Sequence, residues 1–174
     1  SKGKARNPYE FGVKVTLATT LKEGLVVGMR SMPGNPYDGH TLDETIEQVS
    51  ILANHRPRTV MVDKGYKGAE VEGVQILRSG QRRGVTRTMR AMINRRSAIE
   101  PTIGHMKSDG RLDRNPLKGA LGDALHAVLC GAGHNIRLLL SLLRLFAAHL
   151  RAIVLAWLAP STSDSRAQIA LAAA

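Results

Sequence analysis

The first regular pattern along the chain is an alternation of apolar residues with polar residues or glycine from Glu10 to Leu17. A period of two predicts a half-buried β-strand. A turn at residues 19–24 and an apolar run at residues 25–30 would complete a hairpin. The chain is therefore expected to begin with two antiparallel strands.

After the hairpin the sequence pattern predicts a helix, and after the helix it again predicts strands. Residues 31–39 are dense in Gly and Pro and predict a loop, and Thr41 and Glu44 then have the spacing of a capping box at the start of a helix. The apolar run Thr59–Val62 predicts a buried strand, and Val74–Leu77 a weaker one. This order predicts an α/β fold with an antiparallel hairpin at its start.

The rest of the chain is expected to be helical. Residues 87–107 favour helix with an interruption at 94–97, where Ser97 and Glu100 again match a capping box. Residues 121–158 predict one long helix, or two that break at Gly131 and Gly133. Between Ile136 and Ala159 the apolar run is interrupted too often for an ordinary membrane span, by Arg137, Arg144, His149 and Arg151, so no membrane partner is expected. The Ser- and Ala-rich tail, residues 161–174, is expected to be disordered.

The net charge of the chain indicates the class of partner that it binds. The chain has 25 Lys and Arg against 14 Asp and Glu, a net charge of +11, and such an excess favours a polyanion, with nucleic acid first. Ten of the basic residues lie between Arg82 and Lys118, a segment with three acids. Cys130 is the single cysteine, so a disulfide framework within one chain is excluded, and a reducing cytoplasm fits.

Two acids are candidates for metal-dependent chemistry. Asp63 is expected at the carboxyl end of a strand, where ligands approach open α/β sheets, and Glu100 is the natural second ligand. Carboxylates suit Mg²⁺, and two ions roughly 3.5–4 Å apart can support displacement at phosphorus. The simpler readings are that Asp63 is a turn residue before Gly65 and that Glu100 closes a helix cap with Ser97.

Basic residues near the two acids are candidate DNA contacts: Lys64, Arg95, Arg96, His105 and Lys107. Arg96, Glu100 and Lys107 fall near one face if the helix is continuous. Cations there would hold a DNA backbone over the acids. An exposed helical histidine with no such role is the simpler reading of His105.

Several segments together resemble the DDE transposases of bacterial insertion sequences, in the group of insertion sequences five and four. Asp63-Lys-Gly-Tyr66 resembles the family's second catalytic aspartate segment. Arg96, Glu100 and Lys107 match the spacing of its Arg-Glu-Lys signature, and residues 33–42 and 133–137 also look like members of this group. The signature usually has a tyrosine three residues before the arginine, where this chain has Ile93.

The resemblance implies a mobile-element enzyme that cleaves DNA and transfers the freed strand during transposition. It implies Asp63 and Glu100 as catalytic metal ligands, Mg²⁺ or Mn²⁺ as cofactor, transposon ends and target DNA as partners, a homodimer, and a cytoplasmic, nucleoid-associated location. It also implies a ribonuclease-H-like core at 1–118, followed by long C-terminal helices, with 119–160 a helical segment of the same domain.

The expected first catalytic aspartate has no counterpart before Glu10. The chain is therefore expected to be the carboxyl-terminal part of a transposase, with a core incomplete at its N-terminus and little catalysis by itself. The alternative from another functional class is a noncatalytic DNA-binding remnant.

Overall fold

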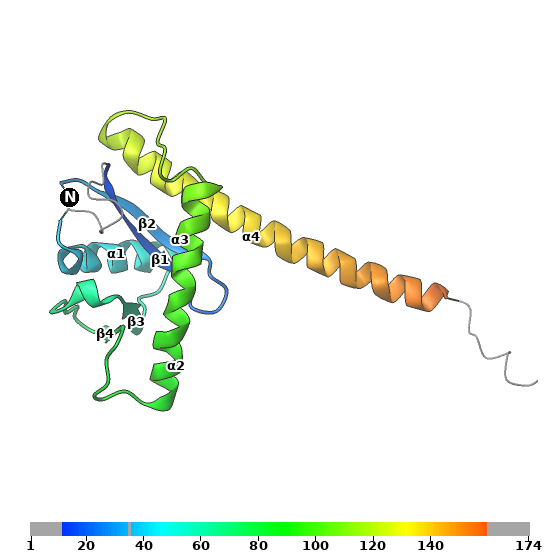
Figure 1. Cartoon of the computed structure of the whole chain (residues 1–174), viewed down its shortest axis with the longest axis horizontal. Helices are drawn as coiled ribbons and strands as arrows, with labels where there is room; N and C mark the ends of the chain where they lie inside the picture. The colour runs from blue at the N-terminus through cyan, green and yellow to red at the C-terminus, as the bar shows by residue number, and fades with distance from the viewer. Residues whose placement is uncertain (1–11, 35, 160–174) are drawn as a thin grey trace, which may run out of the picture. The chain divides into compact units, whose positions relative to one another are not determined.

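The computed structural model describes residues 12–34 and 36–159. In chain order the elements are β1 (Lys14–Thr19), β2 (Val26–Met32), α1 (Asp38–Leu52), β3 (Thr59–Val62), the 3₁₀ turn η1 (Lys64–Tyr66), β4 (Gln75–Arg78), α2 (Arg87–Arg95), the 3₁₀ turn η2 (Arg96–Ala98), α3 (Ile99–Ser108) and α4 (Gly119–Leu158) (Figure 1). The chain divides into two compact units between Ile136 and Arg137. The start of the first predicted strand, at residues 10 and 11, and the tail at 161–174 lie outside the described residues.

The predicted hairpin is confirmed, but its strands are covered on both faces rather than one. β1 and β2 pair antiparallel. Val15 and Leu17 pack against a buried cluster of Met29, Met106, Ala127 and Cys130. On the other face Thr16 is only 5% exposed, and a Cβ at Gly28 would come within 2.9 Å of Val49 in α1. Alternation predicted a solvated face, whereas α1 covers that face.

Helix α1 begins earlier than its expected cap. Its N-cap is Tyr37, so the helix starts inside the loop predicted at residues 31–39. The Tyr37 side chain makes no capping hydrogen bond. Thr41 is already within the helix and donates its hydroxyl to the Asp38 carbonyl at 2.9 Å. The expected capping box of Thr41 and Glu44 is therefore wrong, because the threonine hydroxyl bonds back into its own helix.

Strands β3 and β4 form a second, separate sheet. They pair in parallel, with Thr59 opposite Gln75 and Val62 opposite Arg78. The two short strands predicted from apolar runs are thus confirmed, but the described residues form two two-stranded sheets instead of one. Leu42 and Ile46 of α1 pack with Val62 in a second buried cluster. Helix α1 therefore contacts both sheets (Figure 1), and the carboxyl ends of β3 and β4 share one edge.

The interruption predicted within residues 87–107 is confirmed. Helix α2 begins at a cap in which Thr86 Oγ1 accepts from Met89 N, and it ends at the 3₁₀ turn η2. Helix α3 then begins after Ala98, and no side chain caps it. The expected capping box of Ser97 and Glu100 is wrong, because Ser97 lies within η2 and is not the N-cap of α3. The Glu100 carboxylate is therefore not used in a helix cap.

Helix α4 is continuous, with no break at Gly131 or Gly133. A Cβ at Gly131 would come within 3.1 Å of Met29 and Val26, so glycine here allows close approach between α4 and β2. The Asn135 side chain accepts from Val26 N at 2.8 Å and donates to Val26 O at 2.9 Å. This amide pairs with β2 as a neighbouring strand would, and it fixes the first half of α4 on the hairpin.

The second half of α4 has different surroundings. Every described residue from 139 onward is exposed. The helix is long and apolar enough to cross a membrane, with a hydropathy of 1.9 in an 18-residue window of which none is buried. Its arginines therefore do not exclude a span by length and composition, although one such helix is weak evidence for a span.

Candidate active site

Asp63 lies directly after β3, at the edge that sequence predicted. Its backbone carbonyl accepts from Tyr66 N at 3.2 Å and begins the turn η1. Its carboxylate makes no capping hydrogen bond and is 53% exposed. A role as a turn residue thus accounts for the backbone hydrogen bond of Asp63 but not for its carboxylate, which is available to other groups.

Glu100 lies in the first turn of α3, and its side chain is 73% exposed. Because no side chain caps α3, the capping reading does not account for this carboxylate. The helix that carries it is fixed by Met106, which is 0% exposed within the cluster beneath the hairpin.

A single arginine joins the two acids. Arg96 Nη1 lies 3.4 Å from Asp63 Oδ1 and 3.9 Å from Glu100 Oε1, and the Arg96 side chain is 19% exposed. Asp63, Arg96 and Glu100 are called the acid–arginine cluster below. Ion pairs this open to water contribute about 0–1 kcal/mol each. Their importance is geometric, because they hold acids from β3 and α3 around one cation.

The cluster offers a partial ligand set for a metal ion. Among the described residues, no group of three or more His, Cys, Asp or Glu side chains is placed to hold a metal. Two exposed carboxylates nonetheless fit Mg²⁺, a hard cation that is often bound by one or two carboxylates together with waters and substrate phosphates. The donor set therefore fits Mg²⁺ or Mn²⁺ in the presence of a phosphate-bearing substrate.

Residues 1–136 match the family model of the transposase DDE domain. The chain belongs to this family. The match ends at Ile136, the last residue of the first compact unit. DDE transposases typically use divalent metal ions, and membership implies DNA binding. Comparison with curated proteins and with solved structures gave no match.

The basic residues predicted to bind DNA do not form one group in this transposase domain. Arg96 belongs to the acid–arginine cluster. Its neighbour Arg95 donates to the carbonyls of Leu21 at 2.9 Å and Lys22 at 3.2 Å, so it ties α2 to the turn of the hairpin. His105 and Lys107 are exposed on α3, and His105 Nδ1 lies 3.1 Å from Asp109 Oδ2.

Sequence reasoning missed the support for the Asp63 turn. The Asp38 carboxylate of α1 forms an ion pair with Lys14, and a Cβ at Gly65 would come within 2.6 Å of Asp38 Oδ2. Glycine is therefore needed for α1 to approach the turn. Burial and the nearby Asp38 carboxylate raise the pKa of Tyr66 above 10.0, with a smaller contribution from Asp63. The proximity of Gly65 to Asp63 in the sequence was the available signal.

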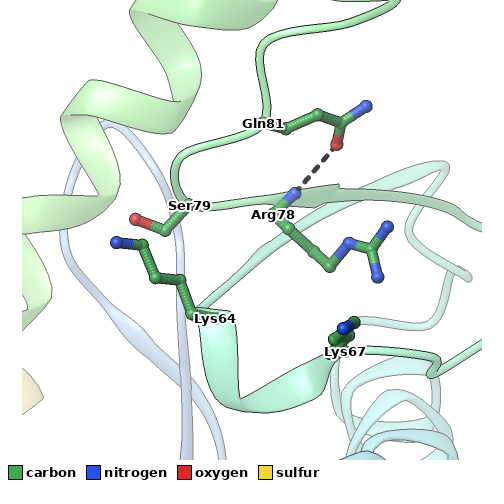
Figure 2. A pocket seen from close by; sticks show the side chains of 5 residues that line it. All are labelled: Lys64, Lys67, Arg78, Ser79 and Gln81. Carbon is green, nitrogen blue, oxygen red and sulfur yellow. Dashed lines mark hydrogen bonds between the residues drawn. The ribbon is translucent and has the colours of Figure 1, made fainter.

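Sequence reasoning also missed a basic pocket beside Asp63. It has a volume of about 360 Å³ and is lined by Lys64, Lys67, Arg78, Ser79 and Gln81 (Figure 2). Only Lys64 was predicted to bind DNA. The other residues come from the turn after β3 and from the end of β4, which meet because the two strands pair in parallel.

Proposed function

We propose that this transposase domain cleaves DNA and transfers DNA strands with the help of Mg²⁺ or Mn²⁺, and that Asp63 and Glu100 are two of its catalytic carboxylates. The observation that carries the proposal is the guanidinium of Arg96, which approaches both acids at the carboxyl end of β3. Neither acid has a capping role that would explain it otherwise. The proposal includes a ribonuclease-H-like core, action as a homodimer on transposon ends, and a location in the cytoplasm at the nucleoid.

In this proposal each residue of the cluster has a separate task. Asp63 and Glu100 would hold the metal through their carboxylate oxygens. When bound, such an ion lowers the cost of placing negative charge on the attacking and leaving oxygens at phosphorus. Arg96 positions both carboxylates while the site is without DNA, and its fixed charge lies beside the place that a scissile phosphate must enter.

The surrounding charge supports DNA as the substrate. The segment from Arg82 to Lys118 carries ten basic residues against three acids, and it includes α2 and α3. Phosphate contacts of this kind position a duplex without reading its sequence. They also make affinity fall steeply with salt concentration.

A noncatalytic DNA-binding role is the second candidate. The absence of a group of three metal-binding side chains among residues 12–34 and 36–159 favours it. In that case Asp63 and Glu100 would serve only as counter-ions that fix Arg96. The two candidates differ in what the acids bind.

The two candidates are separated by the binding of Mn²⁺ to the whole chain in the presence of DNA, measured by electron paramagnetic resonance. The catalytic proposal predicts that Asp63→Asn and Glu100→Gln each weaken Mn²⁺ binding. The matched control is Glu70→Gln, which removes an exposed carboxylate outside the cluster. Equal Mn²⁺ binding by the wild type, both cluster variants and the control would overturn the catalytic proposal.

A further inference from the structure

We infer that the pocket formed by Lys64, Lys67, Arg78, Ser79 and Gln81 is a phosphate-binding site that holds the backbone of a DNA strand beside the acid–arginine cluster. The inference rests on the proposed action on DNA and adds a binding site to it. Only Lys64 of these five residues was a candidate DNA contact from sequence.

The position of the pocket connects it with the candidate catalytic acids. Val62 lies opposite Arg78 in the parallel pair, and Ser79 N donates to Val62 O at 2.9 Å. Asp63 and Lys64 follow β3 at this edge, while Arg78 and Ser79 end β4 at the same edge. A strand of DNA that reaches Asp63 therefore passes close to the pocket.

The charges in the pocket have no partner within the described part of the chain. Lys64, Lys67 and Arg78 form no ion pair with any described residue, and no carboxylate lines the pocket. Three like charges around one hollow repel one another and attract an anion. The hydroxyl of Ser79 adds a neutral donor. This set of donors suits the oxygens of a phosphodiester.

Backbone contacts shape the pocket before any ligand arrives. The Gln81 side chain accepts from Arg78 N at 3.3 Å and donates to Arg83 O at 3.2 Å, which fixes the turn after β4. The Tyr37 hydroxyl donates to Lys67 O at 3.0 Å. Figure 2 shows the bond between Gln81 and Arg78 and the five side chains around the hollow.

Gly80 gives Lys64 its room. This glycine has a φ of 80°, and a Cβ there would lie 3.1 Å from Lys64 Cε. A side chain at residue 80 would strain the turn and crowd the lysine. Glycine therefore lets the ammonium group of Lys64 extend along the end of β4.

The salt dependence of DNA affinity tests the inference. Fluorescence anisotropy on a labelled duplex would compare the wild type with Lys67→Gln/Arg78→Gln. The matched control is Arg144→Gln/Arg151→Gln, which removes two exposed charges outside the pocket and outside the basic segment from Arg82 to Lys118. Each phosphate contact contributes about −0.9 to the slope of log affinity against log salt. The pocket variant is expected to lose about one such contact and the control none, and equal slopes for these two variants would overturn the inference.

Two further measurements keep the result interpretable. Thermal unfolding shows whether Arg78→Gln disturbs β4, and Lys67→Gln alone, at an exposed side chain, should still reduce the slope. Titration with inorganic phosphate identifies the ligand. If the pocket variant loses phosphate binding while its DNA slope matches that of the wild type, the pocket takes small phosphates and the inference fails.

The outcome is separable from that of the proposed catalysis. Mn²⁺ binding that depends on Asp63 and Glu100, together with an unchanged DNA slope in the pocket variant, refutes the pocket alone. A reduced slope together with Mn²⁺ binding that does not depend on the acids supports the pocket and refutes the catalytic role.

Discussion

Two charged groups lie at the same edge of the β3–β4 pair, and they differ in how their charges are balanced. In the acid–arginine cluster, Arg96 lies between two carboxylates. In the neighbouring pocket, Lys64, Lys67 and Arg78 have no ion-pair partner among the described residues. The first group carries a net charge of about −1 and the second about +3, by the ordinary charges of these side chains at pH 7.

The difference indicates what each group attracts. A slightly negative pair of carboxylates attracts a divalent cation, whereas an unbalanced positive hollow attracts a phosphate. DNA with a bound metal ion presents both charges at once. Adjacent sites of opposite sign therefore suit a metal–phosphate substrate better than either site does by itself.

The largest expected effect comes from removing an acid. If the cluster is catalytic, Asp63→Asn and Glu100→Gln should slow Mn²⁺-dependent nicking of supercoiled plasmid by more than the roughly 10–100-fold that loss of an outer-sphere partner costs a metal site. Glu70→Gln should nick as the wild type does. Nicking that persists at the wild-type rate in both acid variants would show that the cluster is structural.

A smaller effect of unusual direction is expected for Arg96→Gln. The substitution removes a positive charge from beside both carboxylates, so Mn²⁺ binding should strengthen several-fold while DNA binding weakens. Stability should fall by only about 1 kcal/mol or less, because the ion pairs are largely exposed. Weaker Mn²⁺ binding in a folded variant would mean that the positioning of the acids by Arg96 outweighs the repulsion between its charge and the metal ion, and that the contrast between the two groups is less sharp than proposed.

Arg95→Gln is the matched comparison for Arg96, one residue away. Arg95 donates to the carbonyls of Leu21 and Lys22 instead of to an acid. Its loss should lower the free energy of unfolding by about 1 kcal/mol, the usual contribution of a hydrogen bond. Mn²⁺ affinity should stay as in the wild type. Urea unfolding and Mn²⁺ titration of both arginine variants check this. A change in Mn²⁺ affinity in Arg95→Gln, with none in Arg96→Gln, would contradict the roles given to the two arginines.

Much of the fold could be predicted because local patterns determine it. The alternation up to Leu17 found the hairpin, and the interruption near Arg96 was placed where η2 lies. The capping boxes failed at Thr41 and Ser97 because a spacing of three residues does not show which residue starts the helix. Sequence left open whether residues 121–158 form one helix or two, and the structure has one; Gly131 instead serves contact with β2, a partner distant in sequence.

The candidate site was predicted less completely. Asp63 and Glu100 were proposed as metal ligands from position, spacing and family resemblance, but nothing local showed that Arg96 would approach both. The pocket was missed because its residues lie in two segments that meet only through the parallel pairing of β3 with β4. Pairings between strands depend on tertiary packing, which short-range patterns do not encode.

The smallest expected effect concerns Tyr66, beside the acid–arginine cluster. Burial and the Asp38 carboxylate raise the pKa of Tyr66 above 10.0, and Arg96 lowers it. Below pH 10 both the folded and unfolded chains keep this proton, so the stabilising contribution is fully present there. Above pH 10 the unfolded chain ionises first, and stability should fall as the pH rises through the raised pKa.

Urea unfolding of the wild type and Tyr66→Phe between pH 8 and pH 11 measures this contribution, in a range chosen around the ordinary tyrosine pKa of about 10. The difference in unfolding free energy should be constant below pH 10 and should change above it in favour of the phenylalanine variant. In an Arg96→Gln background the change should grow, because the cation that lowers the pKa of Tyr66 is gone. An identical pH dependence in both backgrounds would mean that the charge of Arg96 is not felt beyond its two carboxylates.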